Sequence, residues 1–548
     1  MTRSVIDPIT RIEGHLRVEM EVENGKVSDA WVSGGCFRGM EMVVENRTPE
    51  DAAQIVQRIC GVCPVSHAHA SSIAAEKAYG IKISNNARII RNLLEGSQFL
   101  HSNILWFYNL AALDYVNPLN ALKADPADAY ALALEAGTST NSDFVALKER
   151  LSAFADNGQL SIFSGNWFDA EDGTAYTLPP ELDLICTAHY LEALTMQAKA
   201  SEISALLGGK MPHIMTLVPG GTSFVPTDQK LDDLKGLVDE LYTWVASTMI
   251  PDTLALAPHY ADAFDWGKGC GRYLAWGVFE NQSMEMVDRY LPMGVLDDSL
   301  SLSDAQESLI TEYVGRSWYK GSDSYNAPYF TTEPEYTSYD VNDRYTWVKC
   351  PSYDGKPYEA TSLSRILVAY KRNVPFVVEQ VDSLLEALGA PGQISIAQST
   401  LGRTAIRQIE TLYIAGLMKE WVDELIEAVK SGDGEYFRKP EGITGAGTGF
   451  WEAPRGALYH SEEVKDGKIT GYQIIIPSTW NLAPRDAQGV PGPLEQALVG
   501  VPVGDIEKPI NALRTVHSFD PCTACAVHIT EPATGKSFET VTSPWGVK

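Results

Sequence analysis

The sequence predicts a mainly α-helical protein with small β elements, an α+β fold in which long helices form a bundle core. Three observations support this prediction. Apolar residues recur at helical spacing in several long segments, and two short segments alternate apolar and polar residues around an Asx-Gly pair. The composition, 45% hydrophobic and 21% charged, is that of an ordinary globular chain, and 548 residues can bury a large core.

Two β-hairpins are predicted near opposite ends of the chain. Residues 15–32 alternate in polarity around Asn24-Gly25, and residues 464–476 do so around Asp466-Gly467. Asn-Gly and Asp-Gly pairs adopt the positive φ angles of a type I′ turn, which matches the twist of two antiparallel strands.

Helices are predicted between these hairpins. The first begins with Thr48 as N-cap and Pro49 at the first helical position, and it ends near Cys60. Helical spacing of apolar residues then covers 85–113, 182–207, 229–245, 362–388 and 405–429. Residues 249–360 are rich in Gly, Pro, Tyr and Asp, and we expect long ordered loops there, over the helical core.

Charge and hydropathy restrict the partners. The formal net charge of -28 disfavours nucleic acid and anionic membranes. No apolar run approaches the roughly 18 residues that indicate a spanning helix. The first 15 residues have neither the apolar segment of a signal peptide nor a twin arginine. If the protein works outside the cytoplasm, we expect another chain to carry it there.

Eight cysteines are too few for a disulfide framework in a chain of this length. Four are isolated, and four form two CxxC pairs: Cys36, Cys186, Cys270 and Cys350, and then Cys60/Cys63 and Cys522/Cys525. Two such pairs can make a tetrathiolate metal site. Since nearly the whole chain lies between the pairs, such a site would be a buried junction of N- and C-terminal segments.

A structural zinc site and a thioredoxin-like redox motif are the alternatives. Zinc ribbons usually keep their pairs within roughly 20 residues, and no βαβ pattern surrounds either pair. Both pairs also have charged or imidazole neighbours, namely Arg58, His67, Asp520 and His528. A closed zinc site has little use for such groups, whereas a catalytic metal uses them to orient ligands and move protons.

The two pairs lie in RICGVCPVSHAHAS and DPCTACAVH, which resemble the two signature motifs of the nickel–iron hydrogenase large subunit. Further matching motifs follow in family order: RIEGHL (Arg11–Leu16), CFRGME (Cys36–Glu41), ALDYVNP (Ala112–Pro118), STLGRTA (Ser399–Ala405), GFWEAPRGAL (Gly449–Leu458) and IIIPSTWN (Ile474–Asn481). The resemblance therefore covers the full length of the chain.

The resemblance implies a nickel ion held by four cysteinates, with Cys60 and Cys522 as terminal ligands. Cys63 and Cys525 would also bridge to an iron that carries CO and cyanide. Thiolates are soft donors and suit such a redox-active centre. The implied reaction is the reversible heterolytic cleavage of H2 to protons and electrons, with an acceptor such as a cytochrome c or a quinone.

The resemblance also implies roles for residues around the metals. The sulfur of Cys522 would be the first base, and Glu13 the first proton carrier; the alternative for Glu13 is a buried salt bridge with Arg11. Arg455 would lie above the open face of the metals, as a fixed cation that keeps its proton. Asp114 and Asp520 would be the carboxylates around Arg455.

Four further residues match the surroundings of the centre. The backbone of Arg455 and the hydroxyl of Ser478 match donors to the cyanides, and His67 fits a donor to a bridging sulfur. Val62 and Leu113 match positions at the end of a gas channel.

A second ion, magnesium or iron, is implied near the C-terminus. Its ligands would be Glu41, the main-chain oxygen of Ile474 and His528, a hard oxygen-rich set with one imidazole. Residues 529–548 resemble the extension that is cut after the histidine once nickel is bound, so 1–528 would be one catalytic unit. The alternative is a surface tail that stays attached.

The implied partners follow from the electron path. The isolated cysteines lack cluster spacing, so iron–sulfur clusters are expected in a small subunit that forms a heterodimer with this chain. A maturation endopeptidase, nickel-insertion proteins and a cytochrome or membrane acceptor are expected too, and nucleic acid is not. The small subunit's twin-arginine signal would bring the pair from the cytoplasm to the periplasm or a periplasm-facing membrane surface.

Three rival assignments are weighed against this one. A respiratory complex I core subunit shares the fold but has lost the cysteine pairs. A non-catalytic zinc scaffold would need neither Glu13 nor Arg455. A cytoplasmic, nucleotide-coupled hydrogenase of the same superfamily would have a diaphorase partner.

Overall fold

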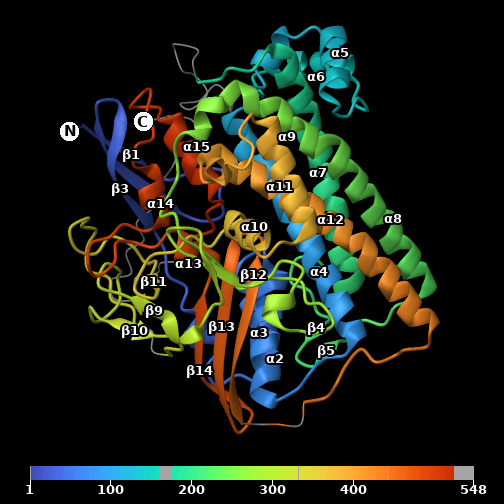
Figure 1. Cartoon of the computed structure of the whole chain (residues 1–548), viewed down its shortest axis with the longest axis vertical. Helices are drawn as coiled ribbons and strands as arrows, with labels where there is room; N and C mark the ends of the chain where they lie inside the picture. The colour runs from blue at the N-terminus through green and yellow to red at the C-terminus, as the bar shows by residue number, and fades with distance from the viewer. Residues whose placement is uncertain (1, 161–174, 331–332, 441, 443, 524–548) are drawn as a thin grey trace.

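The computed structural model describes residues 2–160, 175–330, 333–440, 442 and 444–523. Cys525, His528 and the predicted extension 529–548 lie outside the described residues. Within them, long helices pack side by side, and small antiparallel sheets lie beside the bundle (Figure 1). The predicted mainly helical α+β fold is confirmed.

Four long helices form the bundle: α4 (Asn85–Ile104), α7 (Pro180–Gly208), α8 (Asp228–Trp244) and α12 (Thr400–Lys430). α4 and α12 each bury most of their length in the main apolar cluster, where Trp421 of α12 is fully buried. Burial on this scale makes the bundle the stable frame against which the rest of the chain packs.

Two predicted helices have different ends in the structure. The segment 85–113 is α-helical only to Ile104, and a π-helix (Leu105–Ala111) and a 3₁₀ turn (Ala112–Asp114) follow. The prediction of one helix over 362–388 is wrong: α10 (Ser362–Lys371) and α11 (Pro375–Ala387) are separate. They separate because Asn373 has φ 58° and the residue before Pro375 is pushed out of the helical region.

The C-terminal sheet is antiparallel and consists of β12 (Gly445–Ala453), β13 (Gly456–Lys465) and β14 (Lys468–Ile475). Helix α3 (Pro64–Tyr79) lies along β12 (Figure 1). This close approach depends on three alternating glycines of β12, because a Cβ there would collide with carbonyl oxygens of α3: Gly445, Gly447 and Gly449.

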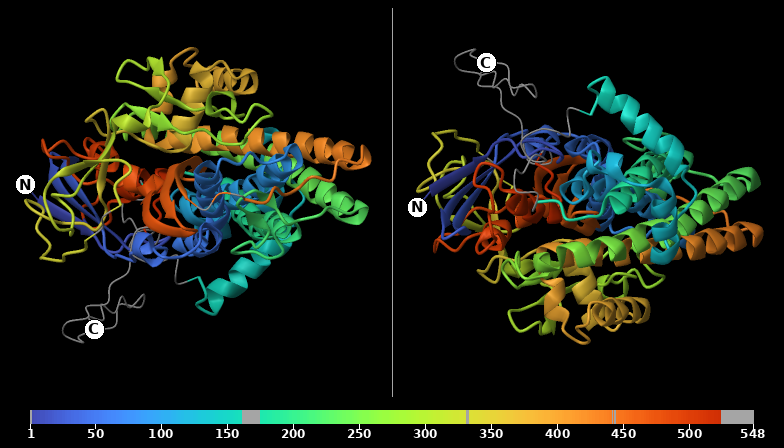
Figure 2. Two further views of the ribbon diagram at one scale, coloured as in Figure 1. Left: turned by 90° about the horizontal axis from the view of Figure 1, so that it is seen from below. Right: turned by 90° about the horizontal axis from the view of Figure 1, so that it is seen from above.

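The N-terminal sheet is also antiparallel and consists of β1 (Thr2–Ile6), β2 (Leu16–Glu23) and β3 (Lys26–Gly34). Its apolar face packs with α14 (Pro493–Leu498) and α15 (Ile510–Ser518). Both views of Figure 2 show this sheet at one end of the molecule and the tips of α8 and α12 at the other.

Short elements complete the fold. The helices are α1 (Met40–Val43), α2 (Pro49–Ile55), α5 (Pro126–Ala136), α6 (Phe144–Asp156), α9 (Ile250–Leu256) and α13 (Pro477–Asn481). The strands are β4 (Leu217–Val218), β5 (Gly221–Thr222), β6 (Tyr273–Ala275), β7 (Gly294–Leu296), β8 (Leu302–Ser303), β9 (Ile310–Tyr313), β10 (Ser324–Asn326) and β11 (Cys350–Tyr353). The predicted loops of 249–360 therefore also carry α9 and six short strands.

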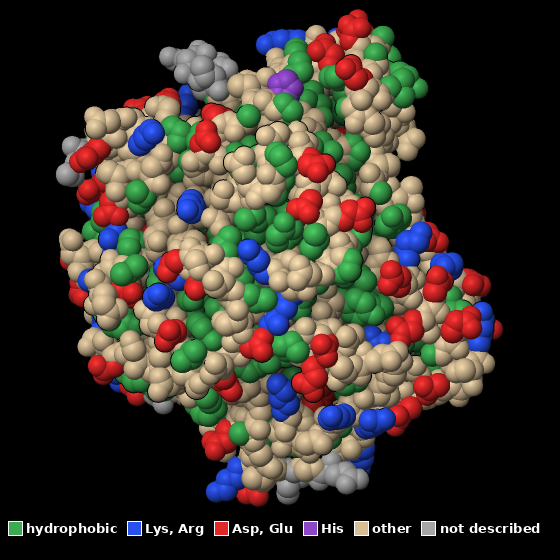
Figure 3. All heavy atoms as spheres, viewed as in Figure 1, with side chains coloured by type: hydrophobic (Ala, Val, Ile, Leu, Met, Phe, Trp, Pro, Cys, Tyr) green, Lys and Arg blue, Asp and Glu red, His purple; other side chains and the backbone are tan. Residues whose placement is uncertain are grey.

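The surface agrees with the composition. Acidic side chains are spread over the whole face shown in Figure 3, in keeping with the net charge of -28. Among the described residues, no helix is long and apolar enough to span a membrane.

Candidate active site

The first cysteine pair lies where a 3₁₀ turn (Val56–Ile59) ends and α3 begins. Cys63 is the N-cap residue of α3, with Pro64 at its first position, and Cys60 and Cys63 are both buried. The main-chain N–H groups of Val62 and Cys63 each donate to Cys60 Sγ at 3.3 Å. Hydrogen bonds of this kind favour a thiolate, the form that binds metals.

Long-range contacts bring Cys522 to this pair. A parallel bridge joins it to Glu13, and the Thr523 N–H donates to Glu13 O at 2.7 Å. The Cys522 N–H donates to Ser478 Oγ at 3.0 Å. Cys522 Sγ lies 3.5 Å from Cys60 Sγ and donates to Glu13 Oε2 at 3.3 Å. Cys60, Cys63 and Cys522, the cysteine cluster, thus form one buried group.

Arg455 is the buried cation beside the cysteine cluster, with 3% of its surface exposed. Its Nη2 pairs with Asp520 Oδ1 at 3.1 Å, and Asp520 Oδ2 accepts from Arg407 Nη1 at 2.7 Å. Burial lowers the pKa of Arg455, but Asp520 and the cysteine cluster outweigh it and hold this pKa well above its ordinary value. Among the described residues, Arg455 Nε and Nη1 have no hydrogen-bond partner.

Asp114 and Asp520 differ in their partners. Asp520 pairs with Arg455, as predicted, whereas Asp114 pairs with Arg11 and with His517 Nδ1 at 2.5 Å. Burial raises the pKa of Asp114, but Arg11 and His517 outweigh it and lower this pKa to about 2. Asp114 is therefore a buried anion that anchors the segment around Arg11.

His67 lies on the first turn of α3 and is buried. Its Nδ1 shares a hydrogen bond with His460 Nε2 at 3.1 Å, and His460 Nδ1 shares one with the Tyr472 hydroxyl at 2.9 Å. Burial lowers the pKa of His67 to about 4, so the ring is neutral at pH 7. The ring is thereby held between α3 and the C-terminal sheet.

Glu41 and Ile474 lie together, although the contact is made by the Ile474 N–H and a ligand role for the Ile474 oxygen stays a prediction. Glu41 Oε1 accepts from the Ile474 N–H at 2.9 Å, and Glu41 Oε2 lies 3.5 Å from Lys349 Nζ. Lys349 is also 3.6 Å from Glu312 Oε2. These four residues line a cavity of about 80 Å³. Oxygen ligands around a small cavity suit a hard cation.

The sequence did not reveal several buried residues that hold the site. Gln98 Oε1 accepts from the Val65 N–H at 2.7 Å, just after Cys63, and Glu95 accepts from Ser66. Arg407 holds Asp520 from α12. The only sequence signal for these residues is their polarity within otherwise apolar helical segments.

The donors present fit a nickel–iron centre. Three buried thiols within one cluster are soft ligands. The N–H groups of Arg455 that have no partner among the described residues suit an anionic ligand set beside them. A carboxyl group touching one thiol adds a proton acceptor. Such a combination is that of a metal site with an acid–base group beside it.

Comparisons with known proteins agree. The sequence profile of a family described as "Nickel-dependent hydrogenase" matches residues 38–528, and one described as "HoxL-like" matches residues 3–33. The chain is 38% identical to the hydrogenase-2 large chain of Escherichia coli K12, over 96% of this chain and 97% of that one. It is 36% identical to the uptake hydrogenase large subunit of Bradyrhizobium diazoefficiens, over 97% and 96%.

Solved structures give the same result. The Ni-Fe-Se hydrogenase from Desulfovibrio vulgaris Hildenborough in its reduced state matches with a TM-score of 0.80 and 35% identity. The match covers 96% of this chain and 100% of that one. The chain belongs to the nickel-dependent hydrogenase family, as a large subunit and an oxidoreductase acting on H2. Membership of this family argues against the complex I and zinc-scaffold alternatives.

Proposed function

We propose that Cys60, Cys63, Cys522 and Cys525 would hold nickel, and that Cys63 and Cys525 would also be ligands of an iron that carries CO and cyanide. This centre, when bound, supplies the hydride-accepting and electron-transferring chemistry of H2 cleavage. The distance of 3.5 Å between Cys60 Sγ and Cys522 Sγ supports two thiolates converging on one ion. Burial of the cluster keeps bulk water away from it.

The proton leaves H2 through protein groups. Cys522 Sγ takes it first, and Glu13 Oε2 accepts it next and passes it on. The single observation that carries this proposal is the 3.3 Å contact between Cys522 Sγ and Glu13 Oε2, which is within hydrogen-bond reach for sulfur. Main-chain contacts of Glu13 with the Cys522 segment keep the two groups in register.

Arg455 acts as a fixed cation beside the reacting H2. Its ion pair with Asp520 holds the guanidinium on one side, and Nε and Nη1 remain for the centre and its ligands. The Ser478 hydroxyl oxygen accepts from the main-chain N–H of Cys522, so the hydroxyl proton of Ser478 is available to a cyanide. The main-chain N–H of Arg455 is the second proposed donor to a cyanide. Asp114 holds the Arg11 segment, and His67 would be a donor to a bridging sulfur.

Access for H2 is proposed beside Leu113. A largely apolar cavity of about 250 Å³ is lined by Leu113, Ala112 and Val116, together with residues of α6 and α7. A small apolar gas partitions into such a cavity without needing hydrogen bonds. Leu113 and Val62 would form the last constriction before the centre.

The cavity at Glu41 is proposed as the magnesium or iron site, with the Ile474 oxygen and His528 as further ligands. We also propose that cleavage after His528 removes residues 529–548 from a precursor by a maturation endopeptidase, after nickel-insertion proteins have acted. Residues 1–528 would then be the single mature unit.

Large subunits of this family form heterodimers with a small subunit. We propose that the partner of this chain carries iron–sulfur clusters and passes electrons to a cytochrome or membrane acceptor. The naming of relatives as uptake hydrogenases supports a periplasmic or periplasm-facing location. Co-export with the small subunit would bring the chain there.

The experiment is a metal analysis of protein purified without air from its native host. Elemental mass spectrometry should find near one nickel per chain, iron in excess and little zinc. The excess iron would come from the co-purified small subunit. Zinc without nickel in protein of mature length would contradict the proposed centre.

A further inference from the structure

Arg455 lies in a very tight loop. Ala453 of β12 pairs with Gly456 of β13, so Pro454 and Arg455 alone connect the two strands. Gly456 has φ 135°, and a Cβ there would collide with the carbonyl oxygen of Ala360, two residues before α10. The loop is therefore pressed against α10, and only glycine fits after Arg455.

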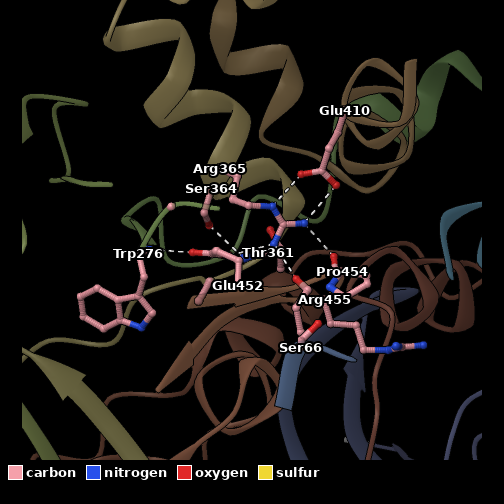
Figure 4. A network of polar contacts seen from close by, with 12 residues as sticks. Ser66, Trp276, Thr361, Ser364, Arg365, Glu410, Glu452, Pro454 and Arg455 are labelled. Atoms are coloured by element: carbon pink, nitrogen blue, oxygen red, sulfur yellow. Dashed lines mark hydrogen bonds and ion pairs between the residues drawn. The ribbon is translucent and has the colours of Figure 1, made fainter. Parts of the chain in front are cut away.

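Arg365, on α10, is fully buried and holds this loop. Its Nη1 donates to Ala453 O at 2.9 Å, and its Nη2 donates to Pro454 O at 2.7 Å (Figure 4). Both carbonyls immediately precede Arg455. Arg365 therefore holds the main chain that leads into Arg455, while Asn481 Nδ2 donates to Arg455 O at 3.5 Å.

The other three donors of Arg365 are also used. Nε and Nη2 form a fork with Glu410 at 2.6 and 3.0 Å, and Nη1 donates to Glu452 Oε2 at 2.9 Å. Glu452 Oε1 accepts in turn from the Trp276 N–H at 2.6 Å. A guanidinium has five N–H donors, and all five are satisfied here. Lysine has three donors and no planar fork, so it cannot reproduce this arrangement.

Helix α12 connects this clamp to the counter-ion of Arg455. Glu410 holds Arg365, and Arg407, one turn earlier, holds Asp520, which pairs with Arg455. One rigid helix thus fixes both the loop that carries Arg455 and the carboxylate that its side chain meets. The ion pair with Asp520 contacts only one end of the Arg455 guanidinium, so its aim depends on the main chain.

We propose that Arg365 is a positioning residue for the H2 reaction, which sets the place of the Arg455 guanidinium by clamping the Ala453 and Pro454 carbonyls. This inference rests on the proposed role of Arg455 beside the metals. It requires no contact between Arg365 and the centre.

A matched control exists elsewhere in the chain. Val218 pairs with Gly221 across another two-residue loop, and buried Arg91 donates to both of their carbonyls, at 2.7 Å to Val218 O and 3.2 Å from Nε to Gly221 O. Arg91 also forms a fork with Glu76. Arg91→Lys therefore removes a similar clamp from a loop without Arg455.

The test is a double-mutant cycle in the purified heterodimer, with kcat expressed per bound nickel. Arg365→Lys should lower kcat by about 100-fold, since displacement of a catalytic group by about 1 Å costs that much. In the Arg455→Lys background, adding Arg365→Lys should lower kcat further by less than about threefold, because the effect of Arg365 on kcat passes through Arg455. Arg91→Lys should leave kcat per nickel unchanged.

If kcat of the double variant is lowered by the product of the two single losses, the residues act independently and the proposal is overturned. A wild-type kcat in Arg365→Lys would also overturn it. If Arg365→Lys yields no folded heterodimer, Glu410→Gln loosens the same fork and is tested in the same cycle. Its loss should likewise disappear in the Arg455→Lys background, and persistence of the loss would overturn the proposal.

Infrared spectra give a readout apart from turnover. The main-chain N–H of Arg455 is a proposed donor to a cyanide. Because Arg365→Lys would displace that main chain, it should shift the cyanide stretching bands, and Arg91→Lys should not. Unshifted bands in Arg365→Lys would count against the clamp. Absence of cyanide bands from the wild-type protein would instead contradict the proposed centre, and the kinetic cycle alone would then decide on Arg365.

Discussion

The N-terminal and C-terminal sheets are built alike. Each has three antiparallel strands in chain order, and the last two strands of each are joined by an Asx-Gly turn: Asn24-Gly25 with φ 53° and 75°, and Asp466-Gly467 with φ 50° and 73°. Each of these hairpins also has a register irregularity next to its turn. The two sheets differ in the loop that joins their first two strands.

The N-terminal loop is long, residues 7–15, and it carries Glu13, which main-chain contacts with Thr523 hold in place. The C-terminal loop has two residues, and it carries Arg455, which the Arg365 clamp holds. The longer loop reaches the Cys522 segment. The shorter one fixes a charge that does not move. In the proposed mechanism, the same sheet design therefore carries a proton-transfer group, Glu13, in one case and a fixed charge, Arg455, in the other.

Glu13→Gln tests the role proposed for the N-terminal loop and should cause the largest loss of activity. The amide keeps the size and the main-chain contacts of Glu13 but cannot carry the proton, so H2 oxidation should fall by about 10²- to 10⁴-fold. Nickel and iron contents should stay at the wild-type level. Glu23→Gln, at the exposed end of β2, is the control and should keep full activity. Full activity in Glu13→Gln would remove Glu13 from the proton path.

Glu462→Gln tests whether a buried carboxyl group of the C-terminal sheet makes the stability of the protein depend on pH. Glu462 is fully buried, and neither carboxylate oxygen has a hydrogen-bond partner among the described residues. Burial, with a smaller contribution from Glu50, raises its pKa from 4.5 to about 8. Between these two values the unfolded chain loses the proton and the folded chain keeps it. This carboxyl therefore lowers the free energy of unfolding by about 1.4 kcal/mol per pH unit as pH rises.

Glu462→Gln should lack this decrease of the free energy of unfolding with pH. Its stability relative to wild type should therefore increase between pH 5 and pH 8. Denaturant unfolding at both pH values measures the difference. Glu463→Gln, on the exposed neighbouring position, should follow the wild-type pH dependence. An identical pH dependence in wild type and Glu462→Gln would show that Glu462 is ionised in the folded protein.

Gly25→Ala and Gly467→Ala should give the smallest effects and sharpen the comparison. No atom lies within 4 Å of a Cβ built at either glycine, so the cost comes from the positive φ angle alone. Each variant should lose about 1 kcal/mol of stability. Thermal unfolding should show similar shifts, and activity per nickel should not change. A loss of activity in one variant only would mean that its turn supports the site.

The sequence predicted the parts of the fold that have local signals. Both Asx-Gly hairpins and the helix capped by Thr48 are confirmed. Helix α3 was not predicted, since it is buried on nearly all sides and lacks a polar face. Strand β12 was not predicted either, because its alternating glycines serve the packing of α3 rather than strand propensity.

The site could be predicted only as far as motifs reach. Cys60, Cys522, Glu13 and Arg455 lie together as the motifs implied. Arg365 could not be found, because its role depends on carbonyls almost 90 residues away in the chain. Such pairings are set by tertiary packing, and no local pattern records them.

The meeting of Cys60 and Cys63 with Cys522 in one buried cluster has a consequence for synthesis on the ribosome. More than 450 residues separate Cys63 from Cys522, which at about 5–20 residues per second takes roughly 20 to 90 s to translate. During that time the first cysteine pair exists without its counterpart. If the four cysteines hold nickel as proposed, the complete set of thiolates is available only after translation has passed Cys525.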